Sequence, residues 1–290
     1  MNYQVLLFYK YVTIEDPSAL REWILTQASS LQLTGRVLVA GEGLNGTLEG
    51  SCENAQAFAQ RLAADPRFAD MKVKTSIGTG NSFQKLSVKV RDEIVGTQFD
   101  ATIDPRVTTG TRISPEELHA WYENGKDFSI IDMRNDYEFK SGHFKDSINP
   151  ELENSRDLPA ALPKLEHLKE KTVLTVCTGG VRCEKMSAYL LAQGFKEVYQ
   201  LENGIHGYME KYPGQNYLGT LYTFDERLTM GFGGAREVIG ECHLCKAKTE
   251  RYVNCANDEC HLHFLACDSC QEGGVPACSP ECDRLTAPVN

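Results

Sequence analysis

The stretch TVLTVCTGGVRCEKMSAYLLAQGF, residues 172–195, decides the fold of the central part of the chain. Its first five residues are apolar or β-branched, which is typical of a buried strand. Cys177 follows directly, and Gly179 and Gly180 let the backbone turn. Apolar residues at helical spacing then predict a helix over 184–193. The stretch therefore predicts a strand, a tight loop that begins with cysteine, and a helix.

The same alternation continues on both sides of this stretch. Ser114 and Pro115 are a helix cap and a first helical residue. Strands are predicted at 128–132 and 197–201, and a polar helix over 164–170. Repeated βα units predict an α/β domain with a doubly wound parallel sheet, which we place at residues 113–220.

The loop after the central strand is a candidate reactive site, because ligands of open α/β sheets bind at the carboxyl ends of strands. Backbone N–H groups of the loop and helix start would stabilise an anion there, and Arg182 adds a positive charge. Such surroundings favour the thiolate of Cys177. The loop residues of this anion cradle are Thr178, Gly179, Gly180 and Val181.

Two cysteines of this loop have alternative interpretations. Cys177 could be only a small buried residue, but the two glycines and the arginine argue against that. Cys183, at the far end of the loop, could resolve an oxidised Cys177 as a disulfide, or could simply pack at the helix start. The catalytic candidates are therefore Cys177, Arg182 and Cys183.

Residues 1–98 predict a β-α-β-β-α-β order and hence an α+β, ferredoxin-like sandwich with its helices on one sheet face. Strands are expected at 4–11 and 36–40, with a glycine-rich turn, GEGLNGTLEG (41–50), leading into the next. Asp16 or Ser18 caps a helix that runs to Leu31, and a second helix covers 52–64. Residues 99–112 read as a linker.

The last two expected strands of this domain, 71–76 and 85–95, alternate basic and apolar residues. Alternate residues of a strand share a face, so the basic ones would lie together on the face without helices. That face is either an ordinary solvated surface or a platform for RNA. The candidate RNA-binding residues are Lys72, Lys74, Lys85, Lys89 and Arg91.

A connecting strap (221–241), which includes FDER at 224–227, leads to a cysteine-rich tail at 242–290. FDER is expected to be a structural strap against the α/β domain, with a place in the reactive site as the alternative. The tail either binds RNA or docks on the α/β domain. The tail has the spacing C-x2-C, C-x4-C, C-x2-C and C-x3-C, enough thiolates for two tetrahedral zinc ions. The candidate ligands are Cys242, Cys245, Cys255, Cys260, Cys267, Cys270, Cys278 and Cys282.

Three points about this tail stay open from the sequence alone. The four pairs of cysteines could form cross-braced sites, with the first and third pairs sharing one ion, or sequential sites. His261 or His263 could replace a cysteine. A reduced, disordered tail and an iron–sulfur site are further alternatives, although the usual ferredoxin spacing is absent.

Overall composition is that of a globular, water-soluble chain of 290 residues. No apolar run reaches the ~20 residues of a membrane span. The N-terminal residues lack the pattern of a signal peptide, so we expect a cytoplasmic protein without disulfides. The net charge of −10 argues against indiscriminate binding to nucleic acid, but not against binding through one basic face.

Residues 113–213 resemble a rhodanese domain in IDMR (131–134), YE (137–138), GHF (142–144) and the Cys177 loop. The resemblance implies that Cys177 carries a persulfide, and that Arg134 and Glu138 form a structural ion pair. His143 departs from the commoner pattern, because Phe-Lys-Asp-Ser follows it rather than Ile-Pro-Gly-Ala.

Taken over nearly the whole chain, FQKLSVKVR (83–91), CTGGVRCEK (177–185), FDER and the cysteine-rich tail resemble the bacterial rhodanese-containing tRNA uridine hydroxylases. The resemblance implies an enzyme that uses molecular oxygen to convert the wobble uridine, position 34, to 5-hydroxyuridine. Its partner would be the anticodon region of tRNA, with no membrane involved. No flavin, haem or facial-triad signature is evident, so no organic cofactor is expected.

Cys177 could act in two ways in such an enzyme: as a nucleophile at uridine C6, or as a thiol that oxygen oxidises and that delivers the oxygen atom. Two other functions compete with hydroxylation. One is a sulfurtransferase that carries sulfane sulfur on Cys177. The other is a non-catalytic module that only binds a partner, which the intact Cys177 loop argues against.

Overall fold

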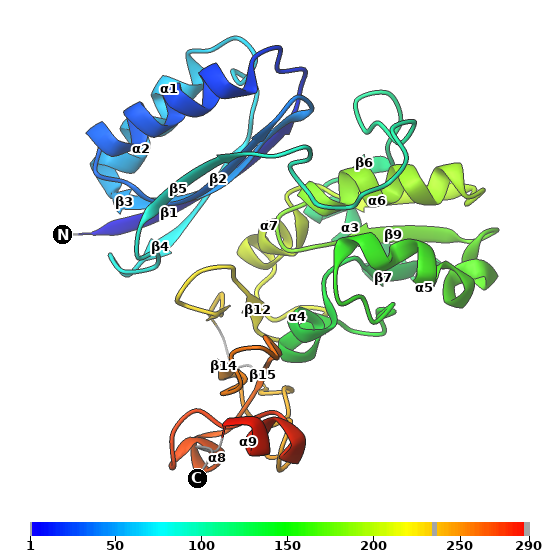
Figure 1. Cartoon of the computed structure of the whole chain (residues 1–290). Coiled ribbons are helices and arrows are strands. Elements are labelled where there is room, and N and C mark those ends of the chain that lie inside the picture. Colours follow the sequence, from blue (N-terminus) through cyan, green and yellow to red (C-terminus); the bar gives the residue numbers. More distant parts are fainter. Residues whose placement is uncertain (1, 234–236, 287–290) are drawn as a thin grey trace.

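The computed structural model describes residues 2–233 and 237–286, which form an N-terminal α/β domain, a central α/β domain and a small C-terminal tail (Figure 1). The expected strap and tail each include a few residues outside these ranges. Among the described residues, none of the helices has both the length and the hydropathy needed to cross a bilayer.

The N-terminal domain has one sheet with two helices on one of its faces (Figure 1). The sheet order is β4-β1-β3-β2-β5. The first four strands have the predicted ferredoxin-like arrangement, and β5 adds a fifth strand parallel to β2. The elements are β1 (Tyr3–Tyr11), α1 (Pro17–Ser30), β2 (Thr34–Ala40), β3 (Gly43–Ser51), α2 (Cys52–Ala63), β4 (Val73–Gly78) and β5 (Leu86–Val90).

One expectation for this domain is wrong. Residues 41–50 are mostly strand rather than turn, because β3 begins at Gly43 and pairs with β1 along its whole length. Glycine is needed inside this strand for space. A Cβ on Gly46 would lie 2.6 Å from the ring of Phe8, and one on Gly50 would lie 2.2 Å from Leu33. Both large side chains belong to the core under the helices.

The central domain is the predicted doubly wound parallel sheet, in the order β6-β10-β9-β7. Its strands are β6 (Thr111–Ile113), β7 (Ser129–Asp132), β9 (Thr172–Val176) and β10 (Glu197–Leu201), and a short β8 (Gly142–Phe144) lies outside the sheet. Its helices are α3 (Pro115–Glu123), α4 (Asp136–Ser141), α5 (Leu158–Leu165), α6 (Val181–Ala192) and α7 (Gly204–Lys211), with 3-10 turns η1 (Ser155–Asp157) and η2 (Glu166–Leu168).

Strand β9 shows why the sheet is covered on both faces. Leu174 and Val176 point into a core shared with α3 and α7, whereas Val173 points into a core shared with α5 and α6. The apolar run of β9 is therefore buried on each side, as expected of a central parallel strand. The residue that follows it, Cys177, lies at the edge of the sheet where ligands bind.

The central domain ends with β11 (Tyr217–Gly219), which pairs with β8. In the described part of the strap and tail the elements are short: β12 (Leu221–Tyr222), β13 (Thr229–Met230), β14 (Tyr252–Asn254), β15 (His263–Leu265), α8 (Asp268–Gln271) and α9 (Pro280–Thr286). The tail has a small core that consists mainly of cysteines together with Phe264 and Ala266. So little apolar surface cannot stabilise a fold by itself, which makes bound metal the expected source of its stability.

Candidate active site and metal clusters

Cys177 lies at the bottom of a tight loop between β9 and α6 and is completely buried. The backbone N–H of Gly180 donates a hydrogen bond to its Sγ at 3.1 Å. Gly180 has a φ of 101°, which favours glycine at this position. The Cys177 carbonyl accepts from the N–H of Ile205 at 2.9 Å, and a Cβ on Gly204 would approach that carbonyl to 2.4 Å. The loop is therefore held between α6 and α7.

The pKa values of the two cysteines of the loop are shifted in opposite directions. Burial by itself would raise the pKa of Cys177. A hydrogen bond from the Cys183 thiol, the charge of Arg182 and backbone N–H groups outweigh burial, and they lower this pKa well below the usual thiol range. Burial and the neighbouring Cys177 raise the pKa of Cys183. The loop thus holds a thiolate at Cys177 beside a protonated thiol at Cys183.

Arg182 is held by a carboxylate that reaches the loop from helix α4. Its Nη2 donates to Oε2 of Glu138 at 2.8 Å, and Glu138 has no exposed surface. Thr178 of the loop also donates to this carboxylate, at 3.2 Å. Although burial alone would raise the pKa of Glu138, Arg182 lowers it, so this side chain is ionised. Sequence reasoning missed this link between Glu138 and the cysteine loop.

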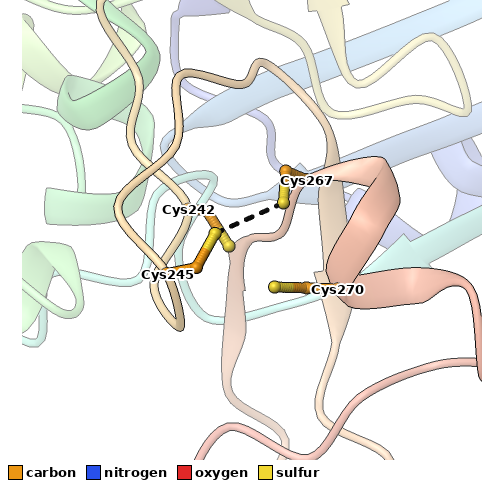
Figure 2. Close-up of side chains that lie close together, drawn as sticks. All are labelled: Cys242, Cys245, Cys267 and Cys270. Carbon is orange, nitrogen blue, oxygen red and sulfur yellow. Dashed lines mark hydrogen bonds between the residues drawn. The ribbon is translucent and has the colours of Figure 1, made fainter.

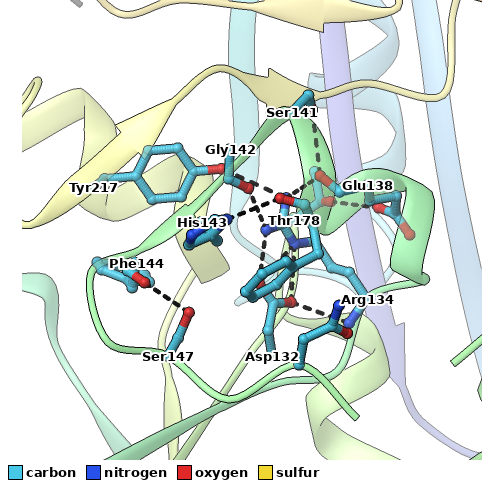
Figure 3. A network of polar contacts seen from close by, with 12 residues as sticks. Asp132, Arg134, Glu138, Ser141, Gly142, His143, Phe144, Ser147, Thr178 and Tyr217 are labelled. Atoms are coloured by element: carbon cyan, nitrogen blue, oxygen red, sulfur yellow. Dashed lines mark hydrogen bonds and ion pairs between the residues drawn. The ribbon is translucent and has the colours of Figure 1, made fainter. Parts of the chain in front are cut away.

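Arg134 does not pair with the side chain of Glu138, contrary to expectation. It is fully buried and pairs with Asp132 at 2.6 Å, and it donates to the carbonyl of Gly142 at 2.7 Å (Figure 3). In the same network His143 stacks on Phe139 and its Nδ1 lies 2.9 Å from the Phe139 carbonyl. These contacts hold α4 against the end of β7 and so support the position of Glu138.

The N-terminal domain covers the cysteine loop with the sheet face that carries no helices. A Cβ on Gly179 would lie 2.9 Å from Leu7, and one on Gly180 would lie 2.8 Å from the hydroxyl of Tyr9. That hydroxyl also donates to Glu184 of α6 at 3.3 Å. Chain order alone gave no signal that Leu7 and Tyr9 of β1 would lie over Cys177.

This packing corrects the expectation of an open basic face. Lys74 is 7% exposed and its Nζ lies 5.0 Å from the centre of the Tyr9 ring. Burial lowers the pKa of Lys74 to about 8. Lys72 forms an ion pair with Glu202 at 3.0 Å. β4 and β5 lie at opposite edges of the sheet, so the other three candidates are separate from these two and remain exposed: Lys85, Lys89 and Arg91.

The eight tail cysteines form two groups of four, and the sulfurs of each group lie within 4.8 Å of one another. Figure 2 shows the group Cys242, Cys245, Cys267 and Cys270; the other is Cys255, Cys260, Cys278 and Cys282. This is the cross-braced pairing. The tetrahedral Zn–S distance of about 2.3 Å requires sulfurs about 3.8 Å apart. The Sγ separations of 3.5 Å (Cys245–Cys267) and 3.6 Å (Cys260–Cys278) fit that requirement.

Within the described residues, both groups contain cysteine only. His263 instead bonds to Asn254 at 2.8 Å and to the Tyr222 hydroxyl at 3.2 Å. Its ring stacks on Tyr252, and Tyr137 of α4 joins the same aromatic cluster. The tail therefore packs against Tyr137, the residue directly before Glu138 in helix α4.

Family models match the chain in three consecutive segments: a UPF0176 acylphosphatase-like domain over residues 3–94, a rhodanese-like domain over 114–211 and a rhodanese C-terminal region over 218–283. A relative from Cytophaga hutchinsonii is 40% identical over 97% of this chain and 90% of its own, and is named tRNA uridine(34) hydroxylase. The chain belongs to the tRNA uridine(34) hydroxylase family.

Relatives from two staphylococci carry the same name. The one from Staphylococcus haemolyticus is 41% identical and the one from Staphylococcus aureus 42% identical, each over 98% of this chain and 90% of its own. The matched length takes in all three parts of this chain, the N-terminal domain, the central domain and the tail.

Proposed function

We propose that this chain hydroxylates C5 of uridine 34 in tRNA with molecular oxygen, and that Cys177 is the reacting thiol. The observation that carries the proposal is the buried Cys177 sulfur, which accepts from the N–H of Gly180 beneath a second domain, in a chain about 40% identical over 97% of its length to a relative named for this reaction. Because tRNA is the substrate, we place the activity in the cytoplasm, where thiols stay reduced.

The thiolate can serve the reaction in two ways. It can add to C6 of the uracil ring, which makes C5 electron-rich; after C5 has gained oxygen, loss of the C5 proton and of the thiolate restores the ring. Alternatively, oxygen oxidises the sulfur, which then delivers the oxygen atom to C5. Either route needs a deprotonated thiol at neutral pH, and Arg182 together with the backbone N–H groups favours that state.

Two electrons must enter the reaction, because one atom of dioxygen enters the uridine and the other leaves as water. The pair Cys177 and Cys183 can supply them: uridine, dioxygen and two thiols give 5-hydroxyuridine, water and one disulfide. An external dithiol would then reduce that disulfide and return the loop to its starting state. Both cysteines are fully buried at the two ends of the same loop, and each shifts the pKa of the other, which supports this pairing.

The tail would hold two zinc ions, each with four thiolates. Sites with four protein ligands leave no open position and act in folding rather than in catalysis. The proposed zinc ions therefore stabilise the tail, which contacts Tyr137 beside Glu138. No step of the reaction involves them.

The proposal is tested by incubating the protein with tRNA that lacks the wobble modification, in air and under argon, followed by mass spectrometry of the nucleosides. We expect uridine to gain one oxygen atom only in air. A sulfurtransferase would instead move sulfur from thiosulfate to cyanide and leave the uridine unchanged, and that result would reject hydroxylation.

A further inference from the structure

A groove of about 620 Å³ lies between the outer edge of the N-terminal sheet and the strap. One wall comes from β2 and β5, where Arg36 and Lys89 line the groove. The opposite wall comes from the FDER segment and includes Phe224 and Glu226. We call this space the basic groove. It is separate from the larger groove at the β4 edge of the same sheet, which Lys72 and Arg112 line.

The two grooves differ in whether their exposed cations are paired. In the larger groove Lys72 pairs with Glu202, and Arg112 pairs with Glu184. In the basic groove the cations are all exposed, and within residues 2–233 and 237–286 none of them has an ion-pair partner; they are Arg36, Lys85, Lys89 and Arg91. The groove also contains Glu226, whereas Asp225 is neutralised by Arg227.

The spacing of these cations suits an extended polyanion. Lys85, Ser87, Lys89 and Arg91 are alternate residues along and just beyond β5, so they follow one another at about 6.6–6.8 Å on one face. Arg36 of β2 lies beside Ser87 in the parallel register. A row of unpaired cations at this repeat matches successive phosphates of a single-stranded nucleic acid.

Phe224 supplies an aromatic surface opposite this row. Its side chain is 46% exposed, which is unusual for a ring of this size. It rests against Tyr222 at a centroid distance of 5.3 Å. The next residues hold the backbone in place, because Arg227 pairs with Asp225 and donates to Ser76 at 2.8 Å. The FDER segment is thus bonded to the N-terminal domain through Ser76, and it presents a half-exposed ring.

The ring connects the groove to the cysteine loop. The guanidinium of Arg182 lies 5.5 Å from the centre of the Phe224 ring, and the same group lowers the pKa of Cys177. A base on Phe224 would therefore lie beside the loop, while its phosphates lie along β5. Cys177 itself is buried deeper, under β1.

We infer that Phe224 stacks on a base that flanks the uridine to be modified, while the cations of the basic groove hold the phosphates of the anticodon loop. This inference rests on the proposed function, in which tRNA is the substrate. It assigns Phe224 to substrate binding and gives the groove a partner of one chemical class, a single-stranded RNA segment.

The test uses an RNA anticodon stem-loop with 2-aminopurine placed on either side of the target uridine, and the variants Phe224→Ala, Phe224→Leu and Phe224→Trp. We expect the alanine and leucine variants to bind the stem-loop about 5- to 100-fold more weakly, and the tryptophan variant to keep binding, because only rings stack on bases. One of the two 2-aminopurine positions should be quenched by the wild type and by Phe224→Trp, and by neither of the other variants.

The cations are tested by the salt dependence of the same binding. Lys89→Gln and Arg91→Gln should each lower the slope of log Kd against log salt by about one if they contact a phosphate. Lys211→Gln, which removes an exposed lysine paired with Glu116 in the central domain, serves as the control and should leave the slope unchanged.

Three outcomes would overturn the inference: full binding by Phe224→Leu, no quenching at either flanking position, or unchanged salt slopes for both cation variants. Tighter binding of an acidic protein than of RNA would reject RNA as the partner. Binding and hydroxylation are measured separately. If the wild type hydroxylates tRNA and Phe224→Ala is fully active as well, this inference is rejected while the proposed function stands. A wild type that binds the stem-loop without oxygen-dependent modification would reject the proposed function alone.

Discussion

Arg182 of the cysteine loop donates to the carboxylate of Glu138 at an Nη2–Oε2 distance of 2.8 Å, and both side chains are buried. The pair joins two elements 44 residues apart in the chain. It also orients a cation that favours the Cys177 thiolate. A helix outside the loop therefore determines part of the chemistry inside it.

Replacing Glu138 by Gln should destabilise the central domain by about 3–5 kcal/mol, because the substitution leaves the Arg182 charge buried without its partner. Urea denaturation followed by near-ultraviolet circular dichroism measures this change. Glu166→Gln removes an exposed pair with Lys169 and should change stability by no more than about 0.5 kcal/mol. Equal effects of the two substitutions would contradict the account.

The acidity of Cys177 predicts the pH dependence of its ionisation. Its pKa lies below the usual thiol range, so the thiolate persists at neutral pH and is lost as the pH falls through this lowered pKa. The measurement is the thiolate absorbance near 240 nm, as the difference between wild type and Cys177→Ser at each pH. Arg182→Gln should move the transition to higher pH and Arg182→Lys should move it less. An ordinary thiol pKa for Cys177 in the wild type would contradict the stabilisation of its thiolate by Arg182 and the backbone N–H groups of the loop.

The tail should contain two zinc ions per chain, and pairs of cysteine substitutions distinguish their arrangement. In the cross-braced arrangement, Cys242→Ala with Cys267→Ala affects one site and should leave one zinc ion. Cys242→Ala with Cys255→Ala affects both sites and should leave none. A sequential arrangement predicts the reverse. Metal content by elemental mass spectrometry decides between them, with Cys52→Ala as the control that keeps both ions.

Access to Cys177 should require the N-terminal domain to move, because β1 covers the loop and the sulfur has no exposed surface. Lys72 and Glu202 form an exposed pair across the two domains. Replacing both with cysteine and joining them by a short bismaleimide should lower the rate of tRNA modification at least tenfold. The same double variant without the reagent is the control. Full activity after complete cross-linking would show that the substrate reaches the thiol without domain opening.

The sequence predicted helices and strands correctly where the hydrophobic pattern and the capping residues indicate the same element. The strand at 172–176 and the capping of α3 by Ser114 are observed as predicted, because each depends on neighbouring residues only. The fold class is also confirmed, because the order of strands and helices along the chain follows from these local signals. The turn expected at 41–50 was wrong, because the glycines of β3 serve the packing of Phe8 and Leu33, which are distant in sequence.

The candidate site was only partly predictable. The position of Cys177 follows from the strand and loop pattern. The roles of Tyr9 and Glu138 depend on how domains and helices pack, and a single sequence carries no local sign of that. For the same reason Lys74 was expected on an open face and lies instead beneath the central domain.

The most direct test of the central claim is the reaction of wobble-unmodified tRNA with the protein under isotopically labelled oxygen, read by nucleoside mass spectrometry for Cys177→Ser and for Cys52→Ser. The account predicts one labelled oxygen atom on uridine 34 with Cys52→Ser and none with Cys177→Ser, while both variants remain folded. Full labelling by Cys177→Ser would contradict it, because hydroxylation would then proceed without the thiol on which the proposed chemistry depends.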